Sequence, residues 1–310
     1  MGHGRWSCDT YDAAARYRRA RGESAFAYSD SGARKVHPRL DPYGVTVREC
    51  RDSDEHARST AIAVLFDVTG SMGHVPRVLQ TKLPGLLNLV RDKGYATDPQ
   101  ILFGAIGDAT CDHVPLQIGQ FESDNRMDED LSLIVLEGGG GGQRTESYEL
   151  AMYFMARHTS LDCWEKRGRK GYLFIIGDEM PYREVKPREV NTIIGERTET
   201  IAVQRIVAEL QQAYDVYYLM PAGSSYVGDQ QILSTWHRLL GQNVIELDDL
   251  DAVCEVIGLT IGLGEGAIDL DSGLSDLMEV GSGAAGRGDG GRDRQRAREV
   301  VARALDKRWV

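Results

Sequence analysis

The chain has 310 residues, of which 42% are hydrophobic and 27% are charged, and its formal net charge is -11 at pH 7. These values are typical of a soluble globular protein with one large domain and additional segments. The negative charge argues against a protein that coats nucleic acid or an anionic membrane. The five cysteines are scattered without CxxC spacing, and the N-terminal residues lack the apolar core of a signal peptide. No stretch reaches the roughly 18 apolar residues of a membrane span. We therefore expect a cytoplasmic protein with reduced thiols.

Changes in composition divide the chain into four segments. Residues 1–58, rich in Arg, Tyr, Ser and Asp, predict an N-terminal extension, and residues 59–263 predict the main domain. Residues 264–291 are acidic and then Gly-rich, which is typical of a linker. Residues 292–310 predict a basic amphipathic helix with a net charge of +4, either docked on a partner or disordered when free. Four aromatic side chains of the extension are expected to pack on the domain: Tyr11, Tyr17, Phe26 and Tyr28.

Residues 59–263 alternate between apolar runs of strand length and segments with helical spacing. The expected strands are 61–67, 101–109, 170–179, 215–223 and 243–249, and the expected helices are 76–94, 124–137, 144–159, 198–214, 230–241 and 250–262. This alternation predicts βαβ crossovers and a doubly wound, mostly parallel sheet. The segment 114–122 follows its neighbour after a short turn, which predicts an antiparallel strand at the sheet edge.

Polar side chains stand where several of these strands end. The first strand leads into Asp67, Thr69 and Ser71, the strand 170–179 ends near Asp178, and Thr145 follows five glycines at 138–142. Because ligands bind beyond the carboxyl ends of parallel strands, these groups are expected to meet at one edge. Carboxylates and hydroxyls are hard oxygen donors, which suit Mg²⁺ or Mn²⁺ better than Zn²⁺.

The same residues resemble the metal-ion-dependent adhesion site (MIDAS) of the von Willebrand factor A (vWA) domain family. DVTGSM is similar to the DxSxS element of that family, with Thr69 in place of the first Ser, and GGGGGQRTES and LFIIGDEMP resemble its threonine loop and its later aspartate element. The resemblance covers about two thirds of the chain. It implies that Ser71, Thr69 and Thr145 touch the metal directly, whereas Asp67 and Asp178 act mostly through water. It also implies a vacant coordination position that a Glu or Asp of a partner protein fills.

Besides Thr69, the sequence departs from the family pattern at two further places. Gln143 and Arg144 stand between the glycines and Thr145, which changes the register of the threonine loop, and Glu179 replaces the glycine that commonly follows the aspartate. Asp108 also ends a strand and is interpreted as a turn residue or an outer partner of the metal site. Glu146 and Glu179 are interpreted as solvated or outer residues.

These patterns predict a non-enzymatic adaptor of the intracellular bacterial vWA type, which binds a protein partner through Mg²⁺. The resemblance implies a MoxR-like AAA+ ATPase partner or a role in a bacterial stress or defence assembly. One alternative is a metal-dependent hydrolase or phosphotransferase on the same sheet, and another is a structural subunit of a larger assembly. A Ser71 nucleophile is disfavoured because TGSMG has Thr69 where the G-x-S-x-G motif has glycine, and His237 stands inside a helical pattern.

Overall fold

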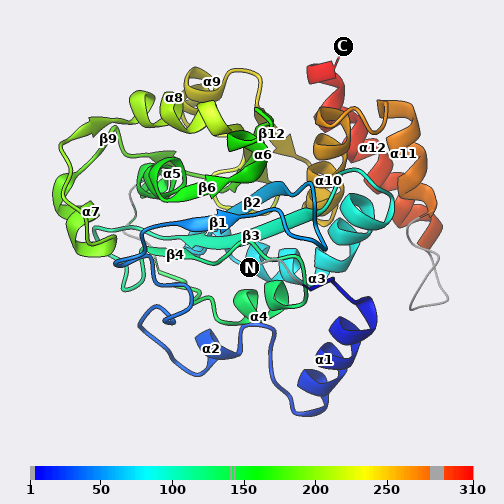
Figure 1. The fold of residues 1–310 in the computed structure, drawn as a ribbon, viewed down its shortest axis with the longest axis horizontal. Coiled ribbons are helices and arrows are strands. Elements are labelled where there is room, and N and C mark those ends of the chain that lie inside the picture. The colour runs from blue at the N-terminus through cyan, green and yellow to red at the C-terminus, as the bar shows by residue number, and fades with distance from the viewer. Residues whose placement is uncertain (1–3, 140–141, 143, 280–289, 310) are drawn as a thin grey trace.

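The computed structural model describes residues 4–139, 142, 144–279 and 290–309. Its centre is a six-stranded sheet of order β12-β11-β7-β2-β3-β4 (Figure 1). All neighbouring strands are parallel except β3 and β4. The strands are β2 (Thr60–Asp67), β3 (Pro99–Ile106), β4 (Leu116–Ile118), β7 (Gly171–Ile176), β11 (Tyr214–Pro221) and β12 (Val244–Leu247). The predicted fold class, a doubly wound and mostly parallel sheet with one antiparallel edge strand, is confirmed.

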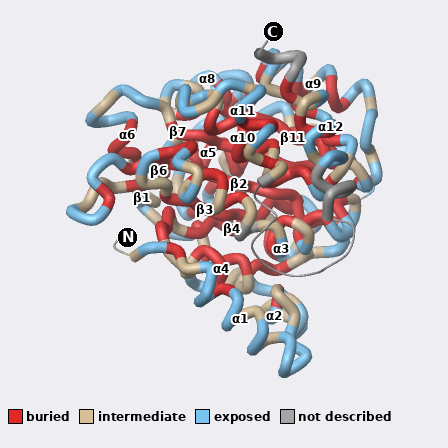
Figure 2. The backbone as a smooth tube through the Cα atoms, turned by 90° about the vertical axis from the view of Figure 1, so that its right-hand side faces the viewer, coloured by how far each residue is buried: buried red, intermediate tan, exposed pale blue. Residues whose placement is uncertain are grey.

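Helices cover both faces of the sheet, because its central strands are apolar on both sides. In β2, Ile62, Val64 and Phe66 belong to one core, whereas Ala61 and Leu65 belong to the other. The first core includes side chains of α3 (Val75–Leu87), α10 (Val253–Gly264), α11 (Leu270–Glu279) and α12 (Gly290–Trp309). The second includes α5 (Tyr148–Arg157), α8 (Val203–Ala213) and α9 (Gln230–Leu240). Figure 2 shows that the strands of the sheet are buried and that the exposed residues lie on the outer sides of the helices and in the loops. No described helix is both long and apolar enough to cross a membrane.

The N-terminal extension wraps along the domain. It contains α1 (Cys8–Ala20), α2 (Ala27–Asp30) and β1 (Arg48–Cys50), and β1 pairs in parallel with β6 (Thr159–Leu161). Tyr11 and Phe26 are buried, as expected, whereas Tyr17 is 61% exposed. The extension also reaches the sheet edge, because the backbone N–H of Ile118 in β4 donates to the carbonyl of Leu40 at 2.8 Å.

Two segments differ from the expected elements. The helix expected at 124–137 is the shorter α4 (Arg126–Ser132), and residues 270–279 of the expected linker form α11, which packs against α10 and α12. The helix expected at 292–310 is α12, which docks on this chain itself: Val301 and Leu305 are fully buried in the first core. Residues 280–289 of the expected linker lie outside the described residues.

Short elements complete the domain. They are the 3-10 helices Gly70–Met72 and Leu250–Ala252, the π-helix Asn88–Asp92, α6 (Asp162–Glu165), α7 (Pro187–Ile193), β5 (Thr145–Glu146), β8 (Met180–Pro181), β9 (Glu184–Val185) and β10 (Ile201–Ala202). β5 pairs in parallel with β8, and β9 pairs antiparallel with β10. The β5–β8 pair matters for function, because it joins the segment after the Gly-rich loop to the segment after β7.

Candidate metal centre

The candidate site lies where the strand order of the sheet reverses direction. The chain passes from β2 to β3 on one side of β2, and it later adds β7 and β11 on the other side. Loops that leave β2 and β7 therefore diverge, and in such sheets the crevice between diverging loops is the usual ligand position. Asp67, Thr69 and Ser71 stand at the end of β2, and Asp178 stands just after β7.

Four of the five predicted ligand residues form one continuous chain of hydrogen bonds. The Thr69 hydroxyl donates to Asp67 Oδ1 at 2.6 Å, and the backbone N–H of Thr69 reaches the same oxygen at 2.8 Å. The hydroxyl oxygens of Thr69 and Ser71 lie 3.2 Å apart, and Ser71 donates to Asp178 Oδ1 at 2.7 Å. Asp67, Thr69 and Asp178 are buried, while Ser71 is partly exposed. The crevice therefore reaches solvent on the Ser71 side.

A glycine allows the Gly-rich loop to approach the turn after β2. The backbone N–H of Gly70 donates to the carbonyl of Gly139 at 2.5 Å, and that of Gly138 donates to the carbonyl of Val68 at 3.3 Å. A Cβ atom at Gly70 would lie 2.9 Å from the Gly139 carbonyl oxygen, which is closer than ordinary van der Waals contact. Gly70 is thus required for the contact between these two loops.

The loop after β11 closes the other side of the site. The backbone N–H of Tyr226 donates to Asp178 Oδ2 at 3.0 Å, and that of Ser225 donates to the carbonyl of Ser71 at 3.0 Å. Both carboxylate oxygens of Asp178 therefore have donors, which orients the side chain toward Ser71. Burial raises the pKa of Asp178, and these hydrogen bonds oppose that rise.

Tyr148 is a site residue that sequence reasoning missed. It lies in the first turn of α5, is fully buried, and donates its hydroxyl to Asp67 Oδ2 at 2.7 Å. Its ring packs edge-on against Trp236 and Tyr218. A Cβ atom at Gly177 would lie 2.0 Å from the Tyr148 hydroxyl oxygen, so the absence of a side chain at the end of β7 makes room for this contact. No motif in the sequence marks Tyr148, because its role depends on how α5 packs.

Thr145, the fifth predicted ligand, lies in the β5–β8 strand pair. Its side chain contacts Tyr182 and is not part of the hydrogen-bonded chain of four residues. Thr145 pairs with Met180 across β5 and β8, only two residues after Asp178. Burial raises the pKa of Tyr182, and side-chain hydrogen bonds with Thr110 and Thr145 oppose that rise. The Tyr182 hydroxyl also contacts both carboxylate oxygens of Asp108, at 3.2 and 3.0 Å. Thr145 thus stands beside the hydrogen-bonded chain of four residues, in a second group that contains Asp108 and Tyr182.

Glu146 and Glu179 are buried, so the first of their two interpretations, as solvated residues, is wrong, and the second, as outer residues of the site, stays open. They are 2% and 4% exposed, and one oxygen of each carboxyl group has no hydrogen-bond partner. Burial and the nearby negative charge of Asp67 raise the pKa of Glu146 far above its usual value, and burial likewise raises the pKa of Glu179. The hydrogen bond between the two side chains raises the pKa of Glu146 further and opposes the rise at Glu179. Two further buried carboxyl groups therefore lie near Asp67.

Burial and hydrogen bonding also have opposite effects on the pKa of Asp67. Burial raises its pKa to about 7, although hydrogen bonds from Thr69 and Tyr148 favour the charged form. Asp178 adds a further rise through like-charge repulsion. A nearby cation would favour the ionised carboxylate instead, because an opposite charge lowers the pKa of an acid.

The donor set fits a hard divalent cation. Among the described residues, no group of three or more His, Cys, Asp or Glu side chains is arranged to hold a metal, so a site here depends on hydroxyl oxygens. Ligands about 2.1 Å from Mg²⁺ in an octahedron lie roughly 3 Å from their neighbours. The Thr69–Ser71 and Ser71–Asp178 oxygen pairs, at 3.2 and 2.7 Å, have that spacing. The residues present therefore suit Mg²⁺ or Mn²⁺.

The serine of this site has no histidine partner in the described structure. His237 lies on α9, where its ring nitrogen Nδ1 is 2.9 Å from the carbonyl oxygen of Gly241 at the end of the same helix. Ser71 instead bonds to Asp178. Both observations differ from the arrangement of a serine nucleophile and its base, in which the two side chains share a hydrogen bond.

Comparison with known proteins finds similarity only among solved structures. No family model and no curated protein sequence matches the chain. The pilus adhesin SpaC from Lactobacillus rhamnosus GG, in its open conformation, is similar over 70% of this chain and 31% of that chain, with 10% identity and a TM-score of 0.49. Proximal thread matrix protein 1 from the mussel byssus is similar over 69% of this chain and 49% of that chain, with 10% identity and a TM-score of 0.44.

A further structure of the mussel protein is described as having a zinc-occupied MIDAS motif. It covers 69% of this chain and 48% of its own, with 11% identity and a TM-score of 0.43. These similarities are remote, and this chain spans about a third of the adhesin and about half of the mussel protein.

Proposed function

We propose that this chain is a non-enzymatic, vWA-like interaction module that binds Mg²⁺ and uses it to hold a carboxylate of a partner protein. The observation that carries the proposal is the chain of oxygens that joins Asp67, Thr69, Ser71 and Asp178 at the reversal point of the sheet. Ser71 and Thr69 would hold the ion directly, and Asp67 and Asp178 would hold it directly or through water. Thr145 is the third hydroxyl in this proposal, and its strand lies next to the Asp178 loop.

The chemistry of the donors supports a carboxylate ligand from outside. Hydroxyl groups carry no formal charge, so a divalent ion held mainly by them keeps part of its positive charge and attracts an anion. Ser71 and Thr145 are the partly exposed members of the set, so an incoming group would approach from their side. A MoxR-like AAA+ ATPase partner and a cytoplasmic location stay predictions from resemblance and composition.

The test measures thermal and urea-induced unfolding of the purified chain in EDTA, in MgCl₂ and in MnCl₂. We expect a divalent ion to stabilise the fold by about 2.7 kcal/mol when it is present about 100-fold above its dissociation constant. Ser71→Ala should remove most of this response because it deletes the exposed ligand. Ser275→Ala is the matched control, since the Ser275 hydroxyl is exposed on α11 and bonds only its own helix. Equal stabilisation of the chain and Ser71→Ala by Mg²⁺ would contradict the proposed site.

A further inference from the structure

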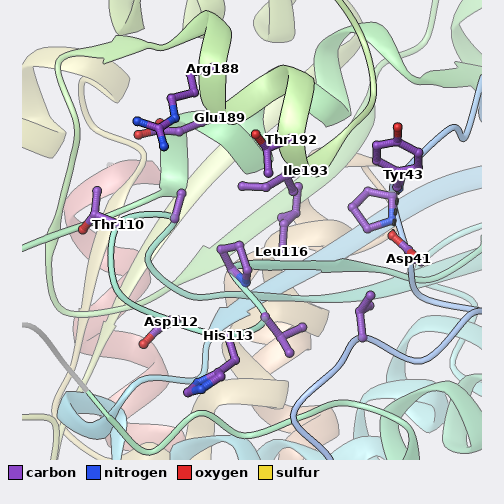
Figure 3. A pocket seen from close by; sticks show the side chains of 15 residues that line it. Asp41, Tyr43, Thr110, Asp112, His113, Leu116, Arg188, Glu189, Thr192 and Ile193 are labelled. Atoms are coloured by element: carbon purple, nitrogen blue, oxygen red, sulfur yellow. Dashed lines mark hydrogen bonds between the residues drawn. The ribbon is translucent and has the colours of Figure 1, made fainter.

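Two cavities lie next to the candidate metal centre, and their charges are opposite. The first, of about 1390 Å³, adjoins Thr145 and extends along the segment from β8 to α7 and along α8 and α9. We name it the arginine groove, after Arg183 and Arg238. The second, of about 700 Å³, lies between the N-terminal extension, the turn after β3 and α7 (Figure 3). We name it the acidic cavity.

The arginine groove is positive in a chain that is strongly negative overall. Its charged side chains are Arg183, Lys186 and Arg238 against Glu184, whereas the whole chain carries -11. Arg183 and Arg238 are exposed, and neither has an ion pair within the described part of the chain. Arg238 donates to the Thr235 hydroxyl at 3.0 Å, which leaves its charge uncompensated. Uncompensated arginines in a concave surface are well suited to carboxylates, which they bind through paired N–H donors.

The acidic cavity has the opposite balance. Figure 3 shows Asp41, Asp112 and Glu189 around it, with Arg188 as its one permanently charged base. His113 also lines it. An acidic ligand would be repelled on this side of the metal centre and attracted on the other, because like charges at close range disfavour binding.

Tyr182 contacts residues of both cavities and one of the predicted metal ligands, Thr145. Its hydroxyl reaches Asp108 and Thr110 toward the acidic cavity, while the side chain lines the arginine groove together with Thr145. The ammonium group of Lys186 lies 4.3 Å from the centre of the Tyr182 ring and forms an ion pair with Glu189 at 2.8 Å, so the uncompensated positive charges of the groove are those of Arg183 and Arg238. The groove therefore begins at a predicted metal ligand and continues away from it along α9.

We infer that the arginine groove receives additional acidic residues of the same partner segment whose carboxylate reaches the metal ion. This inference rests on the proposed function and specifies the partner chemistry: an acidic segment, with its further carboxylates on the α9 side. Arg183 and Arg238 select the segment by its charge. The acidic cavity repels the additional carboxylates of the segment if the segment binds in the reverse orientation. The two cavities together therefore fix the orientation of the bound segment.

The test uses two fluorescent synthetic peptides as probes and measures their binding to the full chain by fluorescence anisotropy. One peptide has a central aspartate flanked by glutamates, and the other has the same aspartate flanked by lysines. Each is titrated in MgCl₂ and in EDTA. The variants are Ser71→Ala, the double variant Arg183→Glu/Arg238→Glu, and the control Arg34→Glu/Arg197→Glu, which makes the same change in net charge at exposed arginines outside both cavities.

We expect the acidic peptide to bind in MgCl₂, and we expect EDTA or Ser71→Ala to abolish that binding. Arg183→Glu/Arg238→Glu should weaken it about tenfold or more, since each reversal replaces an attraction by a repulsion. The control should change the affinity by less than about threefold, because only screened long-range charge is altered. Circular dichroism spectra of the variants establish that they remain folded.

Other outcomes would overturn the inference in distinguishable ways. Magnesium-dependent binding of both peptides that is insensitive to Arg183→Glu/Arg238→Glu would leave the metal function standing and remove the groove from it. Binding that depends on the arginines but not on Mg²⁺ or Ser71 would contradict a segment that bridges groove and metal. Failure of both peptides to bind at millimolar concentration would also overturn it, while Mg²⁺-dependent stabilisation would still report separately on the metal site.

Discussion

Asp67 is the carboxylate on which the polar groups of the candidate centre converge. It is fully buried and accepts hydrogen bonds from the Thr69 backbone, the Thr69 hydroxyl and the Tyr148 hydroxyl. Charge-assisted hydrogen bonds of this kind offset part of the cost of removing a carboxylate from water. Because burial still raises the pKa of Asp67 to about 7, the offset is incomplete in the absence of a cation.

Replacement of Tyr148 by phenylalanine should weaken both the fold and metal binding. Tyr148→Phe removes the donor to Asp67 Oδ2 and leaves that oxygen buried without a partner, at a cost of about 1–3 kcal/mol. It also makes the ionised form of Asp67 less favourable, so the affinity for Mg²⁺ at neutral pH should fall. Urea unfolding in EDTA and a Mg²⁺ titration by isothermal calorimetry measure the two effects.

Tyr214→Phe provides the control for this substitution. Tyr214 is equally buried, but its hydroxyl donates to the neutral hydroxyl of Thr159 at 2.9 Å. The loss of that bond should cost about 1 kcal/mol and leave the Mg²⁺ affinity unchanged. If Tyr148→Phe and Tyr214→Phe had the same effect on Mg²⁺ binding, Tyr148 would have no role in the metal centre.

For individual residues, the sequence predicted which side chains lie near one another when those residues stood at the end of a strand. Asp67, Thr69, Ser71 and Asp178 were placed near one another by the parallel-sheet rule, and their metal binding stays a prediction. Tyr148 could not be predicted because its contact with Asp67 depends on the packing angle of α5 and on the missing side chain at Gly177. The sequence did not decide whether Glu146 and Glu179 are solvated, because neither the two-residue strand β5 nor the short segment between β7 and β8 has a periodicity that reveals burial.

At the scale of elements, the site depends on two loops in close contact. The turn after β2 and the Gly-rich loop touch through Gly70, Gly138 and Gly139, with no side chain between them. The contact keeps the turn compact so that alternate residues point to one place. Glycine serves here by its small size, because the backbone groups must approach closely.

Gly70→Ala should therefore displace the Gly-rich loop and reduce metal binding. Its Cβ would lie 2.9 Å from a backbone oxygen, so one of the loops must move, and we expect a loss of about 1–3 kcal/mol in stability. Gly85→Ala is the control, since Gly85 lies within α3 with open space around its Cβ position, and it should stabilise the fold by roughly 0.5–1 kcal/mol. Urea unfolding measures both changes, and a stabilised Gly70→Ala variant would contradict the proposed contact.

The order of strands and helices was predictable because hydrophobic periodicity survives over long segments. The helix α11 was not predictable. Its segment is rich in acidic residues and glycine and was therefore interpreted as a linker. Its Leu274 and Leu277 are buried, and a Cβ atom at Gly273 would lie 3.2 Å from the Leu259 side chain in α10. This glycine is a packing position, and the stability of α11 depends on tertiary contacts that composition does not reveal.

At the scale of the whole molecule, the buried acids couple folding to pH. The folded-state pKa of Asp67, about 7, lies above its usual value of 3.8, so the folded chain binds a proton that the unfolded chain releases. The stability that this proton provides is complete below the unfolded pKa and is lost as the pH rises through the folded pKa. The metal-free protein should therefore lose this contribution between acidic and slightly alkaline pH.

The comparison of the chain with Asp67→Asn reports this effect together with the response of Glu146 and Glu179, whose pKa values depend on the charge of Asp67, because titrating groups far from Asp67 cancel. In EDTA, the free energy of unfolding of the chain relative to Asp67→Asn should fall by roughly 2 kcal/mol between about pH 5 and about pH 8. Saturating Mg²⁺ should reduce this fall, since a cation favours the ionised carboxylate. Urea unfolding at several pH values measures it. A relative stability that increased with pH would show that Asp67 is ionised in the metal-free fold.

The docked N-terminal extension has a consequence for the edge of the sheet at β4, where other chains could pair with it. β4 is the outermost strand on its side, and an uncovered outermost strand offers unpaired amide groups to any other extended chain. Here the Ile118 amide is satisfied by the Leu40 carbonyl, and the Arg48 guanidinium covers the Ile118 carbonyl at 3.0 Å. The extension therefore covers the edge strand β4 and satisfies the backbone hydrogen-bonding groups of Ile118. A shortened chain that began at residue 59 would retain the candidate metal centre but leave this strand edge uncovered, and we expect it to aggregate through strand-to-strand pairing.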